Sequence, residues 1–243
     1  MLSYRYPVIA REGWLWIALV AIPAGLVQYA FGWVALPLWL LVLLLLFLFR
    51  DPPRKVPASP LGIVSPVDGR VVAIATVHDD YLNRQALSIT VKMGFTSVYS
   101  AHSPMEGKVV EQWLGVPRKV SDSKGEVATY AQWIQSDEGD DLVLVIEASS
   151  PLQRPQCYAQ SGERIGQGQR CGFIRFGSQV EVLLPMGSRI EIAVGDRVRA
   201  GADIIATLVH AKATPPKPTA AGEVEAGEAR QPKNRPGLSI NSP

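Results

Sequence analysis

The chain has 243 residues, of which 47% are hydrophobic, and its formal net charge is +2 at pH 7. So small and dispersed a charge argues against a nucleic-acid-binding protein, because contact with phosphates requires clustered Lys and Arg. Two cysteines, Cys157 and Cys171, are too few for a disulfide framework, and no Cys/His ligand pattern predicts a zinc or other metal site.

The N-terminal part is predicted to be a membrane anchor. Residues 14–49 contain no charged side chain, and this stretch is longer than the roughly 20 residues that one helical crossing needs. Pro23, Gly25 and Gly32 divide the stretch, so residues 1–50 are expected to form a helical hairpin. Whether the hairpin is transmembrane or re-entrant stays open, because each half is short.

Basic residues flank the apolar stretch on both sides. Arg5 and Arg11 precede it, and Arg50, Arg54 and Lys55 follow it. The positive-inside rule therefore places both flanks, and the rest of the chain, on the cytoplasmic side of the cell membrane. The second cluster has an alternative role, which is to bind anionic lipid headgroups. A secretory signal peptide is the competing interpretation, but the stretch far exceeds a usual h-region and lacks a small-residue cleavage site.

The remaining chain divides into a linker, a β-rich domain and a tail. Residues 51–60 contain four prolines, which indicates an extended linker. Residues 61–210 alternate short β-branched runs with Gly, Pro and Asp and predict a mainly β domain, while residues 126–135 fit either a strand or a short helix. Residues 211–243 have almost no large apolar side chains and are predicted to be a disordered tail. The predicted strands cover residues 69–77, 86–92, 107–113, 142–148, 172–176, 179–184, 189–194 and 204–209.

An internal repeat lies inside the β domain. The string SPVDGRVV at 65–72 matches SPMEGKVV at 103–110, and each copy reads as a proline-led turn, an acid, a glycine and a strand. Residues 193–201 resemble the turn of lipoyl and biotinyl carrier folds. Together these features predict a pseudo-symmetric barrel-sandwich domain of hammerhead-like hairpins. Neither copy has the lysine between hydrophobic neighbours that carries a lipoyl or biotinyl group.

The most distinctive motif is GFIRFGSQVEVLLP at 172–185, which is two apolar runs interrupted by Gly177 and Ser178. In isolation a Gly-Ser pair is a bulge or a tight bend. In this context the chain resembles the short, membrane-anchored, pyruvoyl-dependent phosphatidylserine decarboxylases. The resemblance rests on REG at 11–13, FRDP at 49–52, SPVDGRV at 65–71 and IRFGSQVEV at 174–182, in the same order and spacing.

The resemblance implies a carboxy-lyase that is made as a proenzyme. The Ser178 hydroxyl would attack the Gly177 carbonyl, the chain would be cut between residues 177 and 178, and residue 178 would become a pyruvoyl group, the only cofactor expected. This group would accept electrons during decarboxylation of phosphatidylserine to phosphatidylethanolamine. The implied partners are the membrane and the phospholipid substrate. The two fragments are expected to stay associated, and homo-oligomer formation stays open.

The base that activates Ser178 is less clearly defined. Family members use an Asp-His pair, and Asp68 matches the family aspartate, but the family histidine aligns with Tyr99. A tyrosine with a reference pKa of about 10 is a poor base near neutrality. His102 is the nearest substitute, although an odd offset of three residues in a strand points to the opposite face unless a bulge intervenes.

Two alternatives to an enzyme follow from this departure. The first is a non-catalytic, membrane-tethered homologue that keeps the fold as a lipid- or protein-binding module. The second is a membrane-fusion-type adaptor with lipoyl-like hairpins, which is disfavoured because such proteins usually include long helical hairpins and the sequence predicts none after the membrane anchor.

Overall fold

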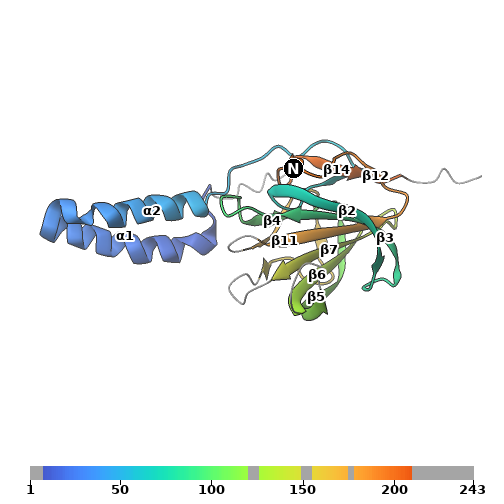
Figure 1. Ribbon diagram of the computed structural model, residues 1–243, viewed down its shortest axis with the longest axis horizontal. Helices are drawn as coiled ribbons and strands as arrows, with labels where there is room; N and C mark the ends of the chain where they lie inside the picture. Colours follow the sequence, from blue (N-terminus) through green and yellow to red (C-terminus); the bar gives the residue numbers. More distant parts are fainter. Residues whose placement is uncertain (1–7, 120–125, 149–154, 175–177, 210–243) are drawn as a thin grey trace, which may run out of the picture. The chain divides into compact units, whose positions relative to one another are not determined.

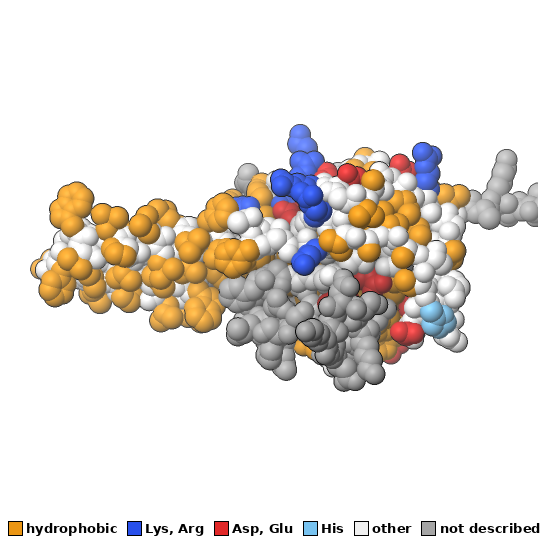
Figure 2. Space-filling view, in the orientation of Figure 1, with side chains coloured by type: hydrophobic (Ala, Val, Ile, Leu, Met, Phe, Trp, Pro, Cys, Tyr) orange, Lys and Arg blue, Asp and Glu red, His pale blue; other side chains and the backbone are white. Residues whose placement is uncertain are grey.

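The computed structural model describes residues 8–119, 126–148, 155–174 and 178–209. Its N-terminal part is a helical hairpin, in which α1 (Arg11–Phe31) and α2 (Leu36–Leu48) are joined by a short 3-10 turn, η1 (Gly32–Ala35). Gly32 begins the turn with a φ of 58°, a conformation that glycine adopts at little cost. The helices lie side by side (Figure 1), and their visible face is mostly apolar (Figure 2). The helical stretch Arg11–Leu48 is long and apolar enough to cross a membrane.

After the hairpin the regular structure of the described residues is β, and all of their strand pairs are antiparallel. The largest sheet has the order β13-β2-β3-β11-β7-β6-β5-β9, and two three-stranded sheets have the orders β4-β10-β8 and β1-β14-β12 (Figure 1). The strands are β1 (Gly62–Val64), β2 (Gly69–Asp79), β3 (Arg84–Lys92), β4 (Ser100–His102), β5 (Gly107–Lys119), β6 (Glu126–Gln135), β7 (Asp141–Ala148), β8 (Gln156–Cys157), β9 (Arg164–Ile165), β10 (Arg170–Phe173), β11 (Gln179–Pro185), β12 (Arg189–Ile190), β13 (Arg197–Val198) and β14 (Ile204–Thr207).

The central strand β11 is buried on both faces. Val180, Val182 and Leu184 belong to the main hydrophobic core, whereas Leu183 belongs to a second, smaller cluster that also contains Val143. Successive side chains of a strand point to opposite faces, so the two clusters lie on opposite sides of the large sheet. This double burial explains why most residues of β11 are apolar, while the buried carboxylate of Glu181 accepts a hydrogen bond from the Ser88 hydroxyl (2.6 Å).

The two sequence repeats form equivalent turns. The Ser65 hydroxyl donates to the carbonyl oxygen of Val67, and the Ser103 hydroxyl donates to that of Met105, each at 2.8 Å. The glycine of each repeat then packs against a neighbouring strand, where a Cβ would overlap a backbone carbonyl oxygen, that of Lys92 for Gly69 and that of Gln135 for Gly107. Glycine is therefore required here for close approach of the backbones.

The structure also reveals a second copy of the carrier-like turn. The string GDRVRAG, which begins at Gly195, has a counterpart GERIGQG, which begins at Gly162. The N–H of Gly195 donates to the carbonyl of Val71 (2.8 Å), and the N–H of Gly162 donates to that of Val109 (2.7 Å). Likewise β13 pairs with β2 as β9 pairs with β5. The internal symmetry therefore covers two pairs of segments. The sequence predicted both members of the first pair, 65–72 and 103–110, but only the turn at 193–201 of the second pair.

These elements confirm the prediction of a mainly β domain after an N-terminal helical segment. The open choice for residues 126–135 is resolved as strand, because β6 pairs with both β5 and β7. Strand β12 ends at Ile190 and is shorter than the predicted run 189–194, whose last two residues belong to a turn that the Asp196 N–H and the Ala193 carbonyl close. Residues 51–60 form neither helix nor strand. The predicted tail, 211–243, lies outside the described residues.

Candidate active site

Ser178 lies directly before β11 and after residues 175–177, a segment that includes Gly177 and lies outside the described residues. Ser178 is only 7% exposed, and its hydroxyl donates to the backbone carbonyl oxygen of Glu147 on β7. Its own carbonyl accepts a hydrogen bond from the N–H of Met93, at the end of β3 (3.0 Å). Residue 178 is therefore fixed from both sides by the strands that flank β11.

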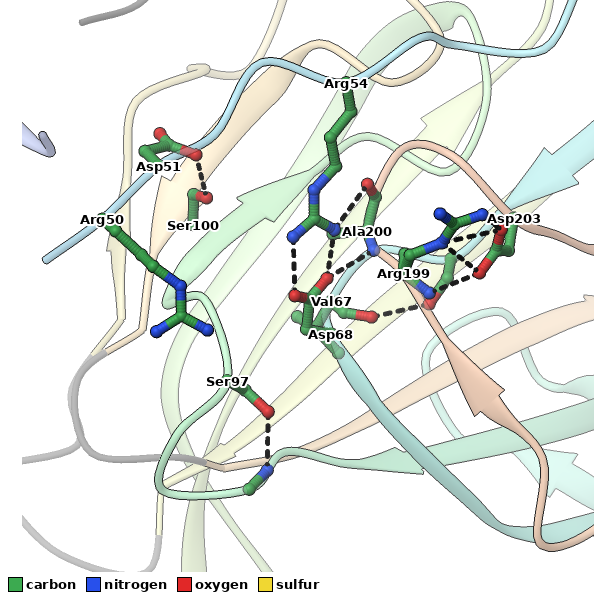
Figure 3. Close-up of polar contacts among 12 residues, drawn as sticks. Arg50, Asp51, Arg54, Val67, Asp68, Ser97, Ser100, Arg199, Ala200 and Asp203 are labelled. Atoms are coloured by element: carbon green, nitrogen blue, oxygen red, sulfur yellow. Dashed lines mark hydrogen bonds and ion pairs between the residues drawn. The ribbon is translucent and has the colours of Figure 1, made fainter. Parts of the chain in front are cut away.

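Asp68 lies in the turn before β2, and three donors hold its carboxylate (Figure 3). Arg54 donates from both terminal nitrogens, with Nη2 2.6 Å from Oδ2, and the N–H of Ala200 lies 2.8 Å from Oδ1. A bidentate guanidinium fixes the plane of a carboxylate. The Arg54 side chain is 16% exposed, so this member of the predicted headgroup-binding cluster is engaged inside the protein.

Asp68 and Ser178 lie at the same end of the large sheet. Two residues after Asp68, Arg70 pairs with Lys92, and Lys92 pairs in turn with Gln179. Since neighbouring strands lie about 4.8 Å apart, the backbones of Arg70 and Gln179 are about 10 Å apart, with β3 between them. Within the described part of the chain no hydrogen bond joins the side chains of Asp68 and Ser178.

His102 is on β4, where its ring packs against the backbone at Gly201; a Cβ there would lie 3.3 Å from Cδ2. Its buried Nδ1 has no hydrogen-bond partner among the described residues. Burial lowers the pKa of His102 to about 4, an effect that nearby Asp51 opposes and that Arg54 and Arg170 reinforce. The imidazole is therefore neutral at pH 7 and able to accept a proton, although it is a weak base.

Tyr99, the residue aligned with the family histidine, is a core side chain that is 3% exposed. Its hydroxyl donates to the carbonyl of Phe95 (2.6 Å), and its ring meets that of Phe173 edge-on, with 6.2 Å between centroids. Burial raises the pKa of Tyr99, against the opposing charge of Arg50. Tyr99 is thus even less ready to ionise than a free tyrosine, and its contacts are those of a packing residue.

An arginine that the sequence analysis did not single out joins the helical hairpin to the β domain. Arg170 on β10 is 6% exposed, and its guanidinium lies 2.9 Å from Oε2 of Glu12 and 3.4 Å from Oδ2 of Asp51. The Ser100 hydroxyl donates to Asp51 (2.7 Å), and the Tyr158 hydroxyl donates to Glu12. The REG and FRDP motifs therefore supply the two carboxylates around Arg170. The two motifs could have indicated Glu12 and Asp51 as functional residues from the sequence alone. Arg170 stands in the string GQR, which matches no motif, and could not have been found in this way.

Comparison with known proteins agrees with these motifs. Residues 42–206 match the model of the phosphatidylserine decarboxylase family. Proteins named phosphatidylserine decarboxylase proenzyme are similar to this chain in Nitrosomonas eutropha (43% identical over 208 residues, 84% of this chain and 96% of the relative), in Aromatoleum aromaticum (41% over 212 residues, 85% and 98%) and in Burkholderia multivorans (40% over 215 residues, 85% and 99%). The similarity extends through the strands and turns that position Asp68 and Ser178. The chain therefore belongs to the phosphatidylserine decarboxylase family of carboxy-lyases.

Proposed function

We propose that this chain is a membrane-anchored phosphatidylserine decarboxylase that cuts itself between Gly177 and Ser178 and then converts phosphatidylserine to phosphatidylethanolamine. The observation that carries the proposal is the placement of Ser178. It is buried directly before the central strand β11 and forms hydrogen bonds with Glu147 on β7 and with Met93 directly after β3. Asp68, the residue that matches the family aspartate, lies at the same end of the sheet. Family membership supplies the substrate class.

In the proposed cut, the Oγ atom of Ser178 attacks the carbonyl carbon of Gly177, so that the peptide C–N bond breaks and an ester forms. Loss of the α-proton of residue 178 then expels the Gly177 carboxylate as a new C-terminus. Water finally releases the nitrogen of residue 178 as ammonia. Gly177 has no Cβ, and the hydroxyl therefore meets little obstruction on its approach.

The residues around position 178 fit the pyruvoyl group that this sequence of steps produces. When present, the group supplies an electron-accepting carbonyl for the loss of carbon dioxide. From Gln179 onward β11 stays paired with β3 and β7, so the end of the strand remains fixed after the cut. The Met93 N–H faces the carbonyl oxygen of residue 178 and holds that end against the sheet.

Asp68 and His102 are the residues proposed to handle protons during the cut. His102 is neutral near pH 7, and its Nδ1, which has no hydrogen-bond partner in the described part of the chain, is available to accept a proton. The charges of Asp68 and Asp51 both act on this ring, and each carboxylate is itself held by an arginine. Tyr99 is assigned no proton transfer, because its hydroxyl is bonded to a backbone carbonyl.

The helical hairpin is proposed to anchor the β domain on the cytoplasmic side of the cell membrane. Both ends of the hairpin return to the same domain, Glu12 through Arg170 and Asp51 through Ser100. A hairpin with both ends on one side of the bilayer agrees with basic residues at both flanks. This arrangement holds the β domain next to the lipid surface.

Purified full-length protein tests the proposal directly. The 26.4 kDa chain should give way to a large fragment that ends at Gly177 and a small one that begins at residue 178. Mass spectrometry should find a pyruvoyl group at the start of the small fragment, and vesicles that contain phosphatidylserine should release carbon dioxide. The Ser178→Ala variant is the control and should stay in one piece. An intact wild-type chain with an unmodified Ser178 would favour the non-catalytic, lipid- or protein-binding homologue instead.

A further inference from the structure

Phe95 is an exposed aromatic residue in the short loop between β3 and β4, here called the Phe95 loop (residues 94–97). Its side chain is 61% exposed, and its neighbours Gly94 and Thr96 are exposed as well. A single apolar side chain on a protein surface is ordinary and needs no explanation by itself. The position of this loop relative to the helical hairpin gives the exposure a meaning.

The Phe95 loop has a fixed shape. The Ser97 hydroxyl accepts a hydrogen bond from the Gly94 N–H (3.0 Å), and the Ser97 N–H donates to the Gly94 carbonyl (3.1 Å). The hydroxyl of Tyr99 donates to the carbonyl of Phe95 itself (2.6 Å). These contacts hold the backbone of the loop while the Phe95 ring stays outside, so the exposed ring is presented by a preorganised support.

The loop lies level with the end of helix α2. Arg50 is the first charged residue after the apolar stretch, and its guanidinium donates both to the Phe47 carbonyl of the helix and to the Thr96 carbonyl of the loop, each at 3.0 Å. The same guanidinium lies 4.1 Å from the centre of the Phe47 ring. A basic side chain at the end of a membrane helix sits at the headgroup level. Thr96 is therefore at that level, and Phe95 is its neighbour in the chain.

The loop is also joined to the site of the proposed cut. Met93, the residue before the loop, donates its N–H to the carbonyl of Ser178 (3.0 Å). A second connection runs through aromatic rings, because Phe49 at the end of the hairpin stacks on Phe173 (5.9 Å between centroids) and Phe173 meets Tyr99. The loop is thus held next to residue 178 through Met93 and next to the end of the hairpin through Tyr99 and Phe173.

We propose that the Phe95 loop is a second membrane contact, in which the Phe95 ring enters the interfacial layer of the bilayer and keeps residue 178 facing the lipid headgroups. The inference rests on the proposed anchoring of the hairpin in a membrane. The occupant of this surface is the lipid interface and not another protein, because the loop is tied to the end of an apolar hairpin through Arg50. Aromatic rings favour the headgroup layer, where one side is apolar and the other is wet.

Photo-cross-linking tests the contact without requiring activity. The photoreactive amino acid p-benzoylphenylalanine replaces Phe95, Leu19 or Met186 in the full chain, which is reconstituted in vesicles of phosphatidylcholine and phosphatidylglycerol. Leu19, in α1 and 61% exposed, reports insertion of the hairpin. Met186, 51% exposed, follows the far end of β11 and is the matched apolar control.

Irradiation should give lipid adducts at positions 95 and 19 and only background at position 186. An adduct at 19 without one at 95 overturns the inference and leaves the membrane anchor intact. Equal adducts at 95 and 186 also overturn it, and so does a cross-link from 95 to a second protein chain. Absence of adducts at both 19 and 95 rejects the proposed membrane anchor and this inference together.

A kinetic comparison tests the consequence for catalysis. The Phe95→Ala variant should raise the apparent KM for phosphatidylserine in vesicles about tenfold, the value expected if about 1.4 kcal/mol of ring burial is lost. It should leave KM unchanged for a short-chain, water-soluble phosphatidylserine, and Met186→Ala should change neither. The Phe95→Trp variant, which keeps an aromatic ring at this position, should have the wild-type KM for phosphatidylserine in vesicles. An equal effect on both substrates, or none on vesicles, contradicts the proposal.

Discussion

The guanidinium of Arg170 lies 2.9 Å from the carboxylate of Glu12, although 158 residues separate the two in the chain. Glu12 belongs to the first turn of the apolar hairpin, and Arg170 belongs to the strand that leads toward residue 178. Asp51, just after the hairpin, contacts the same guanidinium. One buried side chain therefore fixes both ends of the hairpin against the β domain.

The Arg170→Ala substitution should destabilise the protein strongly. It leaves two carboxylates without their counter-ion in a buried site, a change that typically costs about 3–5 kcal/mol. Thermal unfolding of the detergent-solubilised chain should show a clear drop in melting temperature. Arg189→Ala is the control, since that side chain is 75% exposed in its pair with Glu191 and should change the melting temperature little. Similar small effects of both substitutions would refute the structural role of Arg170.

The Asp68→Asn substitution should slow self-cleavage by on the order of a hundredfold or more if the carboxylate takes part in proton transfer. The half-time for loss of the 26.4 kDa chain is the measurement. Asp203→Asn removes a carboxylate that is paired with Arg199 in a more exposed place and should leave this half-time unchanged. Arg54→Ala tests the orientation of the Asp68 carboxylate separately from its charge, because it removes the bidentate guanidinium that holds Asp68 and keeps the carboxylate itself. Wild-type cleavage in Asp68→Asn would remove this residue from the mechanism.

The stability of the protein should fall as the pH drops from about 6.5 toward 4. Burial lowers the pKa of His102 to about 4 in the folded protein, whereas the unfolded value is near 6.5, so the unfolded chain binds more protons within this range. The contribution is fully present above pH 6.5, is lost on the way down through pH 4 and is on the order of 3 kcal/mol. The free energy of unfolding as a function of pH measures it.

Two variants assign this pH dependence. His102→Asn removes the titrating group and should flatten the profile between pH 4 and 6.5. His78→Gln, at an exposed site, should leave the profile as in the wild type. A profile that keeps its slope in His102→Asn would show that other groups are responsible.

Alanine at either repeat glycine should destabilise the β domain. A Cβ on Gly69 or Gly107 would overlap the carbonyl oxygen of Lys92 or Gln135, and overpacking of this kind typically costs about 1–3 kcal/mol. Thermal unfolding of Gly69→Ala and Gly107→Ala measures the cost. Gly187→Ala is the control, because its nearest neighbour would be 3.8 Å from the new Cβ. Unchanged melting temperatures at both repeat positions would contradict the pseudo-symmetric packing.

The longer strands could be predicted because their side chains alternate or stay apolar over several residues. Strands of two residues, such as β8 and β9, are too short to show such a pattern. They are strands because their backbones pair with those of neighbouring strands, and not because of which side chains are buried. Residues 126–135 were ambiguous for a related reason. Strand β6 pairs on both edges and packs on both faces, so helical and strand patterns are not distinguishable there.

The candidate site was only partly predictable. Ser178 and Asp68 stand in recognisable motifs, and the structure brings them to one end of one sheet. The burial of His102 and the neighbours that shift its pKa depend on segments far away in the chain, such as those of Arg54 and Arg170. No local pattern encodes such an environment, and the same holds for the buried position of Arg170 itself.

Strands β10 and β11 are consecutive in the chain, yet they belong to different sheets. A break between residues 177 and 178 would therefore give two polypeptides that share two of the three sheets: β11 would stay between β3 and β7, β13 would stay on β2, and β14 would stay on β1. Dilution would not separate such pieces, because the large sheet and the sheet β1-β14-β12 each contain strands from both, whereas the sheet β4-β10-β8 belongs wholly to the first piece. The nicked protein would thus survive as one body, and its two subunits would come apart only on denaturation.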